Sequence, residues 1–154
     1  MSIIAQLTAD KFYLDIPDEQ AMRTSPVVRT LVVTNSLRVQ LALLSYLSID
    51  SLYYVVYEAS SAAITLSLVE DAVFDLVLLD LSVPRMMGTE ITHRLKSRPN
   101  TTRVILLTRD DKYQRAMLKK QRADGFVHRA LLTTELLSLI HELFENAESS
   151  FTHN

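Results

Sequence analysis

The residues best placed to do chemistry in this chain directly follow short apolar runs, where side chains of different strands can meet. They are Thr34 and Asn35 after the first run, and Asp80, Thr108 and Arg129 after three later ones. A guanidinium keeps its proton and can hold a carboxylate through two parallel hydrogen bonds. We therefore predict an ion pair in which Arg129 grips Asp80.

The formal charge at these positions is not negative. Asp80 contributes −1, whereas Arg129 and Arg109, the residue after Thr108, contribute +2, so the group carries +1. The charge falls to 0 if Arg109 points away from the others. A positive pocket favours an anion, so an anion- or small-molecule-binding domain is one interpretation of the chain.

Alternating strand-like and helical segments would bring these positions to one edge of a sheet. Strands are predicted over residues 30–34, 52–57, 74–80, 104–108 and 125–128, and helices over 37–48, 61–71, 89–96, 110–121 and 133–148. Such alternation is typical of a parallel sheet covered by helices on both faces. Ligand sites in these folds lie at the carboxyl ends of the strands. The predicted fold class is α/β, a three-layer, doubly wound sheet of five parallel strands.

Composition excludes several function classes. The net charge of −2 lacks the basic surplus of nucleic-acid-binding domains, so we expect no direct nucleic-acid binding. The absence of cysteine excludes disulfides and thiolate sites, and two glycines cannot build a phosphate-binding loop. The four histidines show no metal spacing, and no apolar run reaches the roughly 18 residues of a membrane span. With no secretory signal at the N-terminus, we expect a cytoplasmic protein without membrane contact.

The segment 1–28 precedes the alternating pattern and contains too many large apolar residues for a solvated tail. Two interpretations stay open: an arm packed on its own domain, or an arm that binds a partner or is swapped in a dimer. We predict a domain over residues 29–148, followed by a polar tail over 149–154.

The segment 75–90 resembles the phosphoacceptor strand and following loop of the receiver domains of two-component response regulators. The spacing from Asp80 to Pro84 and Gly88 is the same as in that family. The resemblance covers about residues 29–146. It implies a flavodoxin-like fold with strand order 2-1-3-4-5, which would place the tyrosine-rich second strand at the edge of the sheet.

Further positions resemble the family's phosphoryl site. Thr108 resembles its hydroxyl residue, and Arg129 and Arg109 occupy positions beside the phosphoryl group. The segment 125–129 resembles the fifth strand, and within it Phe126 corresponds to the family's switch aromatic. The resemblance implies a role in signalling rather than an enzyme activity, with a histidine kinase, effector or regulator as protein partner.

The chain departs from the family where Mg²⁺ is held. In the family, an acid pair after the first strand, the acceptor aspartate and a backbone carbonyl two residues on cage the ion. Asp80 and Ser82 fit the last two positions, but Thr34 and Asn35 replace the acid pair and Arg129 replaces a lysine. Each missing carboxylate at about 4 Å removes roughly 4 kcal/mol of attraction per unit charge before desolvation. We expect Mg²⁺ to bind weakly or not at all, and no other cofactor.

The chain is accordingly interpreted as an atypical receiver, or pseudo-receiver, that acts through protein binding with impaired Mg²⁺-dependent phosphorylation. The alternative within the same fold is a working phosphoacceptor at Asp80, in a phosphorelay and possibly in the N-terminal part of a transcriptional regulator.

Charge separates along the last third of the chain. Basic residues before the fifth strand (Lys112, Arg115, Lys119, Arg122) contrast with acidic residues in the last helix (Glu135, Glu142, Glu145). A two-fold contact would place each set against its opposite on a second copy. A homodimer through the last two helices and the fifth strand is one hypothesis, and two solvated helix faces are the other.

Overall fold

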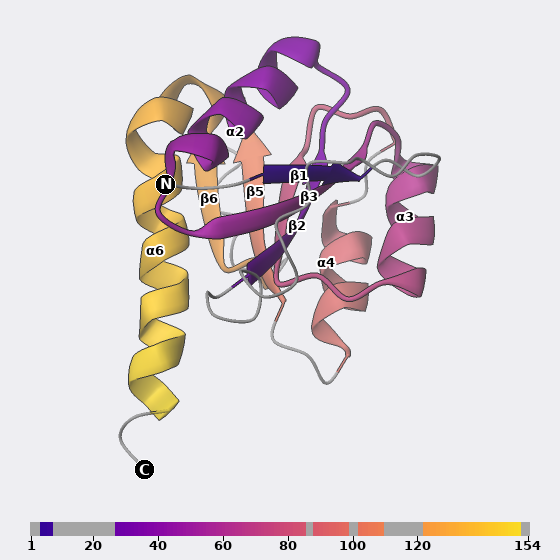
Figure 1. The fold of residues 1–154 in the computed structure, drawn as a ribbon. Helices are drawn as coiled ribbons and strands as arrows, with labels where there is room; N and C mark the ends of the chain where they lie inside the picture. Colours follow the sequence, from indigo (N-terminus) through magenta and orange to yellow (C-terminus); the bar gives the residue numbers. More distant parts are fainter. Residues whose placement is uncertain (1–3, 8–26, 86–87, 99–101, 110–121, 152–154) are drawn as a thin grey trace.

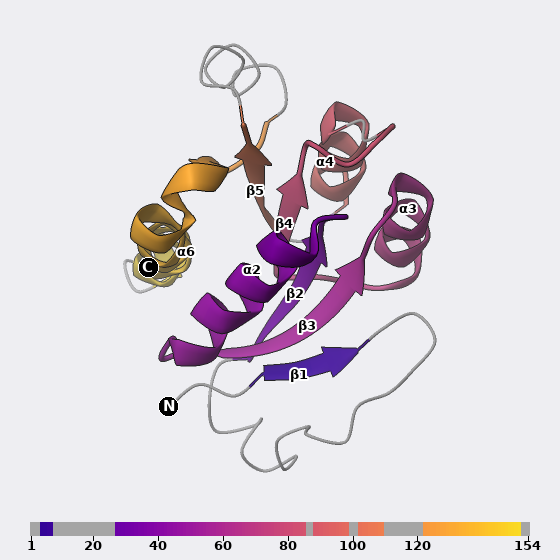
Figure 2. The ribbon, with the colours of Figure 1, turned by 90° about the horizontal axis from the view of Figure 1, so that it is seen from above.

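A parallel sheet with helices on both faces forms the molecule (Figures 1 and 2). The computed structural model describes residues 4–7, 27–85, 88–98, 102–109 and 122–151. The strands are β1 (Ile4–Leu7), β2 (Val27–Val33), β3 (Tyr53–Ala59), β4 (Leu76–Asp80), β5 (Arg103–Thr108) and β6 (Gly125–His128). The helices are α2 (Leu37–Ile49), α3 (Ala62–Asp71), α4 (Gly88–Lys96), the 3-10 helix η1 (Arg129–Leu131) and α6 (Leu132–Phe151).

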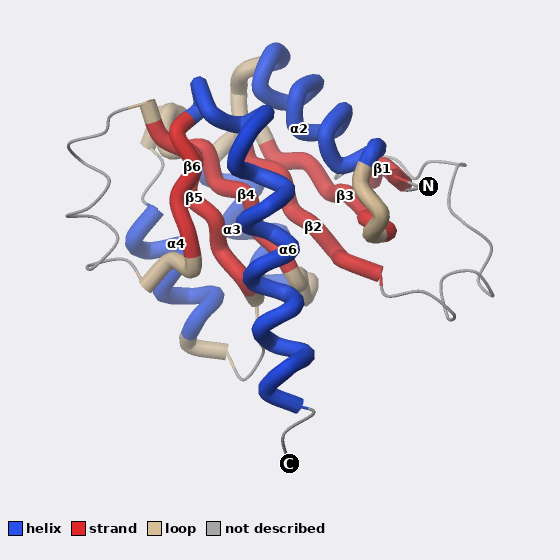
Figure 3. The backbone as a smooth tube through the Cα atoms, turned by 90° about the vertical axis from the view of Figure 1, so that its left-hand side faces the viewer, coloured by secondary structure: helices blue, strands red, loops and turns tan. Residues whose placement is uncertain are grey.

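The strand order is β1-β3-β2-β4-β5-β6, and all neighbouring strands pair in parallel. The five strands from β3 to β6 follow the predicted order 2-1-3-4-5, so the predicted fold class is confirmed. Helices α2 and α6 cover one face, and α3 and α4 cover the other (Figure 3). The predicted helix over 110–121 lies outside the described residues.

All five predicted strands are present, but the expectation that the tyrosine-rich strand lies at the edge of the sheet is wrong. β1 pairs with β3 from Ile4 opposite Tyr54 to Leu7 opposite Tyr57, and it forms a sixth strand. An open edge exposes unpaired N–H and C=O groups, and β1 satisfies those of β3. The first of the predicted strands also begins earlier, at Val27.

Buried strands hold the two faces together. All five residues of β4 are buried, and its side chains alternate between two cores: Leu76 and Leu78 pack with α2 and α6, and Val77 and Leu79 pack with α3 and α4. A strand with cores on both sides must be apolar at every position, which explains its unbroken apolar run. The exception is its last residue, Asp80.

A polar cluster ties α2, β3 and α6 together on the first face. The hydroxyl of Tyr54 donates a hydrogen bond to Asp50, and Nε2 of His141 lies 2.6 Å from the other carboxylate oxygen. Tyr54 and Asp50 are both buried. Burial of the phenol, together with the hydrogen bond and charge of Asp50, raises the pKa of Tyr54 above its ordinary value of 10.0.

Replacing Tyr54 with Phe is expected to lower the free energy of unfolding by about 2 kcal/mol at pH 7, because a buried carboxylate loses a donor. The raised pKa means that Tyr54 contributes its stability fully below about pH 10 and loses it as the pH rises further. Urea unfolding at pH 7 and above pH 10 measures both effects. Tyr53→Phe, on the less buried neighbour, is the matched control. Equal losses in the two variants would contradict the assigned hydrogen bond.

Candidate functional site

Asp80 lies at the end of β4, and its side chain is fully buried. Thr34 Oγ1 donates a hydrogen bond to Oδ2 over 2.7 Å, and the backbone N–H of Ser82 donates to Oδ1 over 2.9 Å. Nη1 of Arg129 lies 3.9 Å from Oδ2. Both carboxylate oxygens therefore already accept a hydrogen bond, and a positive charge lies nearby.

The predicted ion pair between Arg129 and Asp80 forms, but its geometry differs from the prediction. The pair meets at ion-pair distance through one nitrogen, and Nη1 instead donates to Ser82 Oγ over 3.1 Å. The expected two parallel hydrogen bonds are wrong because Thr34 holds Oδ2 at hydrogen-bond distance, while the Ser82 hydroxyl holds the guanidinium. Arg129 thus compensates the buried charge through an ion pair, without donating a hydrogen bond to the carboxylate.

The position of Thr34 is fixed by its backbone and its side chain. Its N–H donates to the carbonyl of Ala59 over 3.1 Å and so continues the pairing of β2 with β3. Its hydroxyl accepts from the N–H of Ser36 over 3.2 Å and donates to Asp80. Ser36 in turn caps α2, where its side chain accepts from the N–H of Val39.

Sequence reasoning considered Thr34 only as a missing acid and overlooked its role as a donor to Asp80. A hydroxyl residue at a strand end beside a buried carboxylate was the available signal. Asn35, by contrast, is exposed.

Thr108 and Arg109 lie at the same edge of the sheet, at and just after the end of β5, whereas Phe126 lies within β6 opposite Leu106. Thr108 is buried at the end of β5, and Phe126 is half-buried against the core beneath α3 and α4. The side chain of Arg109 is exposed. Its carbonyl accepts from Nε2 of His128, whose Nδ1 accepts from the N–H of Ala130. Neutral His128 with its proton on Nε2 satisfies both bonds and joins the loops after β5 and β6.

The donor set that the structure describes at this edge does not fit Mg²⁺. The ion prefers several hard oxygens, commonly from more than one carboxylate. Asp80 supplies one carboxylate, whose oxygens already accept from Thr34 and Ser82 and lie near the charge of Arg129. Over the described ranges, no three histidine, cysteine, aspartate or glutamate side chains lie close enough together to hold a metal ion.

Comparison with known families assigns the chain. The model of the response regulator receiver domain matches residues 30–141, which is most of the sequence. The chain therefore belongs to the family of response regulator receiver domains, as its resemblance implied. A comparison with curated proteins finds no match.

Solved structures agree with this fold. A LuxR-family two-component response regulator from Aurantimonas sp. SI85-9A1 is 21% identical, with a TM-score of 0.68 over 78% of this chain and 86% of that chain. The signal receiver domain of an HD domain-containing protein from Pseudomonas fluorescens Pf-5 is 22% identical, with a TM-score of 0.68 over 82% and 93%. The response regulator TrrA from Thermotoga maritima, solved in complex with Mg²⁺ and BeF, is 25% identical, with a TM-score of 0.65 over 75% and 98%.

None of the helices in the described part of the chain is long and apolar enough to cross a membrane.

Replacing Thr34 with Val is expected to lower the free energy of unfolding by about 2 kcal/mol, because the buried Asp80 carboxylate loses its hydroxyl donor. Thr30→Val, on β2 four residues before Thr34, is the matched control. The Thr30 side chain is also buried, but its hydroxyl donates to the uncharged carbonyl of Val28. We expect a loss of about 1 kcal/mol there. Urea unfolding measures both, and a loss for Thr34→Val no larger than the control would contradict the assigned role.

Proposed function

We propose that this chain is an atypical receiver domain, which signals by binding a protein partner and is neither an enzyme nor an ordinary Mg²⁺-dependent phosphoacceptor. Membership in the receiver family supports a protein partner, since receiver domains interact with kinases and effectors. The observation that carries the proposal is the state of Asp80. Its two oxygens are held by Thr34 and Ser82, and its charge is offset by Arg129.

Electrostatics support this proposal. Attack on a phosphoryl donor brings further negative charge against Asp80, and that charge must be stabilised as the transition state forms. Where family members have an acid pair to hold Mg²⁺, Thr34 engages Asp80 and Asn35 is exposed. Arg129 adds one positive charge, but it is already hydrogen-bonded to Ser82. The residues at this edge therefore stabilise the unmodified carboxylate.

A working phosphoacceptor is the second candidate. It is favoured by the place of Asp80 at the end of β4, at the edge where the other receiver-like residues gather. The following experiment separates the two candidates. A cytoplasmic location, expected from the sequence, stays a prediction.

Incubation with acetyl phosphate and Mg²⁺ is expected to leave the intact mass of the protein unchanged. The triple variant Thr34→Asp, Asn35→Asp and Arg129→Lys restores the residue types of the family and is expected to gain one phosphoryl group. Adding Asp80→Asn to that variant should abolish the gain. Intact mass spectrometry reads all three proteins. Stoichiometric phosphorylation of the unaltered chain, lost on Asp80→Asn, would overturn the proposal in favour of the working phosphoacceptor.

Self-association through the last helices belongs to the same proposal. β6 is the last strand of the described sheet, and α6 covers it with Glu135, Glu142 and Glu145 exposed. Arg122 is exposed just before β6, whereas Lys112, Arg115 and Lys119 lie outside the described residues. The exposed glutamates give α6 an acidic face. A second copy could contact this face with the basic segment that precedes its β6.

Reversing the charges of Lys119 and Arg122 to Glu is expected to dissociate a dimer, because opposite charges would no longer meet across the two-fold axis. Reversing Glu142 and Glu145 to Lys in the same chain should partly restore it. Light scattering across a salt series measures the effect, and added salt should weaken the unaltered dimer. A chain that stays monomeric at hundreds of micromolar in low salt would contradict this contact.

A further inference from the structure

A hollow of about 460 Å³ opens between α2 and the start of α6. Arg38 on α2, Arg109 after β5 and Arg129 on η1 bring three guanidinium-bearing side chains to it. Sequence reasoning anticipated Arg109 and Arg129 at a positive pocket but not Arg38. That residue lies in the first turn of α2 rather than at a strand end, so only the packing of α2 near α6 reveals it.

The charge of this hollow is strongly one-sided. Among the residues that the structure describes, none that lines the hollow is acidic. Arg129 is offset by Asp80, but Arg38 and Arg109 are exposed and form no ion pair with any residue that the structure describes. Three like charges around one space repel each other, and an anion placed among them relieves that repulsion.

The walls of the hollow are apolar. Val39 and Leu132 are buried there, and the half-buried ring of Tyr46 also lines it. Ligand pockets commonly enclose 300–1,000 Å³ and combine apolar walls with a few charged or polar groups. A bare inorganic ion would contact the guanidinium groups and make no contact with the apolar walls.

We propose that this hollow binds a small organic anion, a carboxylate or phosphate monoester carried on an apolar body. The anionic group meets Arg38, Arg109 and Arg129, and the apolar body covers Val39, Tyr46 and Leu132. This site goes beyond the proposed function, because it does not depend on whether Asp80 accepts a phosphoryl group.

Arg129 connects the hollow to Asp80. One nitrogen of its guanidinium lies 3.9 Å from the carboxylate, and Arg129 is also a lining residue of the hollow, so a bound anion and Asp80 compete for one positive charge. Coupling between two sites is reciprocal. An anion bound in the hollow weakens the ion pair between Arg129 and Asp80. Conversely, removal of the Asp80 charge strengthens anion binding in the hollow.

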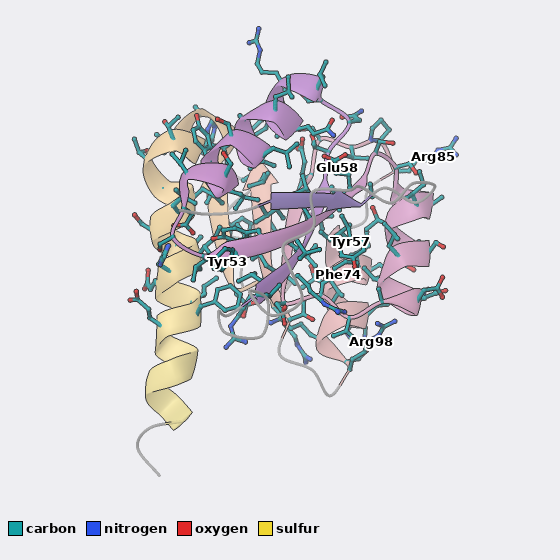
Figure 4. All side chains as sticks on the ribbon, in the orientation of Figure 1. Tyr53, Tyr57, Glu58, Phe74, Arg85 and Arg98 are labelled. Atoms are coloured by element: carbon teal, nitrogen blue, oxygen red, sulfur yellow. The ribbon has the colours of Figure 1, made fainter. Side chains whose placement is uncertain are left out.

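Calorimetric titration of the full chain with 1-naphthyl phosphate and 1-naphthoate tests the site. At least one of the two is expected to bind saturably, and Arg38→Gln and Arg109→Gln should each weaken that binding about tenfold, the loss of one charge-assisted hydrogen bond. Both residues are exposed, so the variants should keep the fold, which thermal unfolding checks. Arg85→Gln is the matched control. Arg85 is an exposed arginine on the α3 side of the molecule, away from α6 (Figure 4).

The other probes separate charge from shape. Neutral 1-naphthalenemethanol and inorganic phosphate should each bind at least tenfold more weakly than the better naphthyl anion. Equal binding of either probe, an equal loss in Arg85→Gln, or no saturable binding of either naphthyl anion would overturn the site. Asp80→Asn should tighten binding by a few fold, and an unchanged affinity would overturn the coupling through Arg129. Phosphorylation plays no part in these readouts, so they stand or fall separately from the proposed function.

Discussion

The buried carboxylate of Asp80 is the constraint on which this end of the molecule depends. A charge taken out of water is costly unless hydrogen bonds and an opposite charge compensate it. Three separate segments supply that compensation: the end of β2 through Thr34, the loop after β4 through Ser82, and η1 through Arg129. Because each donor comes from a different segment, the same interactions fix how α2 starts and how the chain leaves β6.

The sheet makes this convergence possible. Parallel strands end at one edge, and the unbroken burial of β4 carries Asp80 to that edge with no freedom to turn toward solvent. The cores on the two faces hold β4 in place from both sides. A substitution at the carboxyl end of the strands therefore alters side-chain contacts and leaves the sheet intact. Removing the side chain of Thr34 or Arg129 should therefore lower the free energy of unfolding, because the buried charge is less well compensated, while the strand order stays the same.

Sequence patterns predicted much of this fold because its strands and helices repeat with clear periodicity. They missed β1, whose four residues show no alternation and whose pairing with β3 depends on an open edge elsewhere in the chain. At the site, residue types at Asp80 and Arg129 predicted an ion pair correctly but not its geometry. The geometry depends on the competing hydroxyls of Thr34, which binds Asp80, and Ser82, which binds Arg129. In each pair the two residues lie tens of positions apart in the sequence. Arg38 was missed for a related reason, since helix packing alone brings it to the hollow.

The choice of arginine rather than lysine at position 129 links these observations. An ammonium is a compact point charge with three donors, whereas a guanidinium spreads five N–H donors over a plane. One nitrogen of Arg129 faces Ser82 and Asp80, and donors remain for a ligand on the side of the hollow. A lysine whose ammonium lay close enough to pair with Asp80 would have few N–H donors left for a ligand in the hollow. The substitution that weakens the case for ordinary phosphorylation is thus the one that equips this edge to respond to a bound anion.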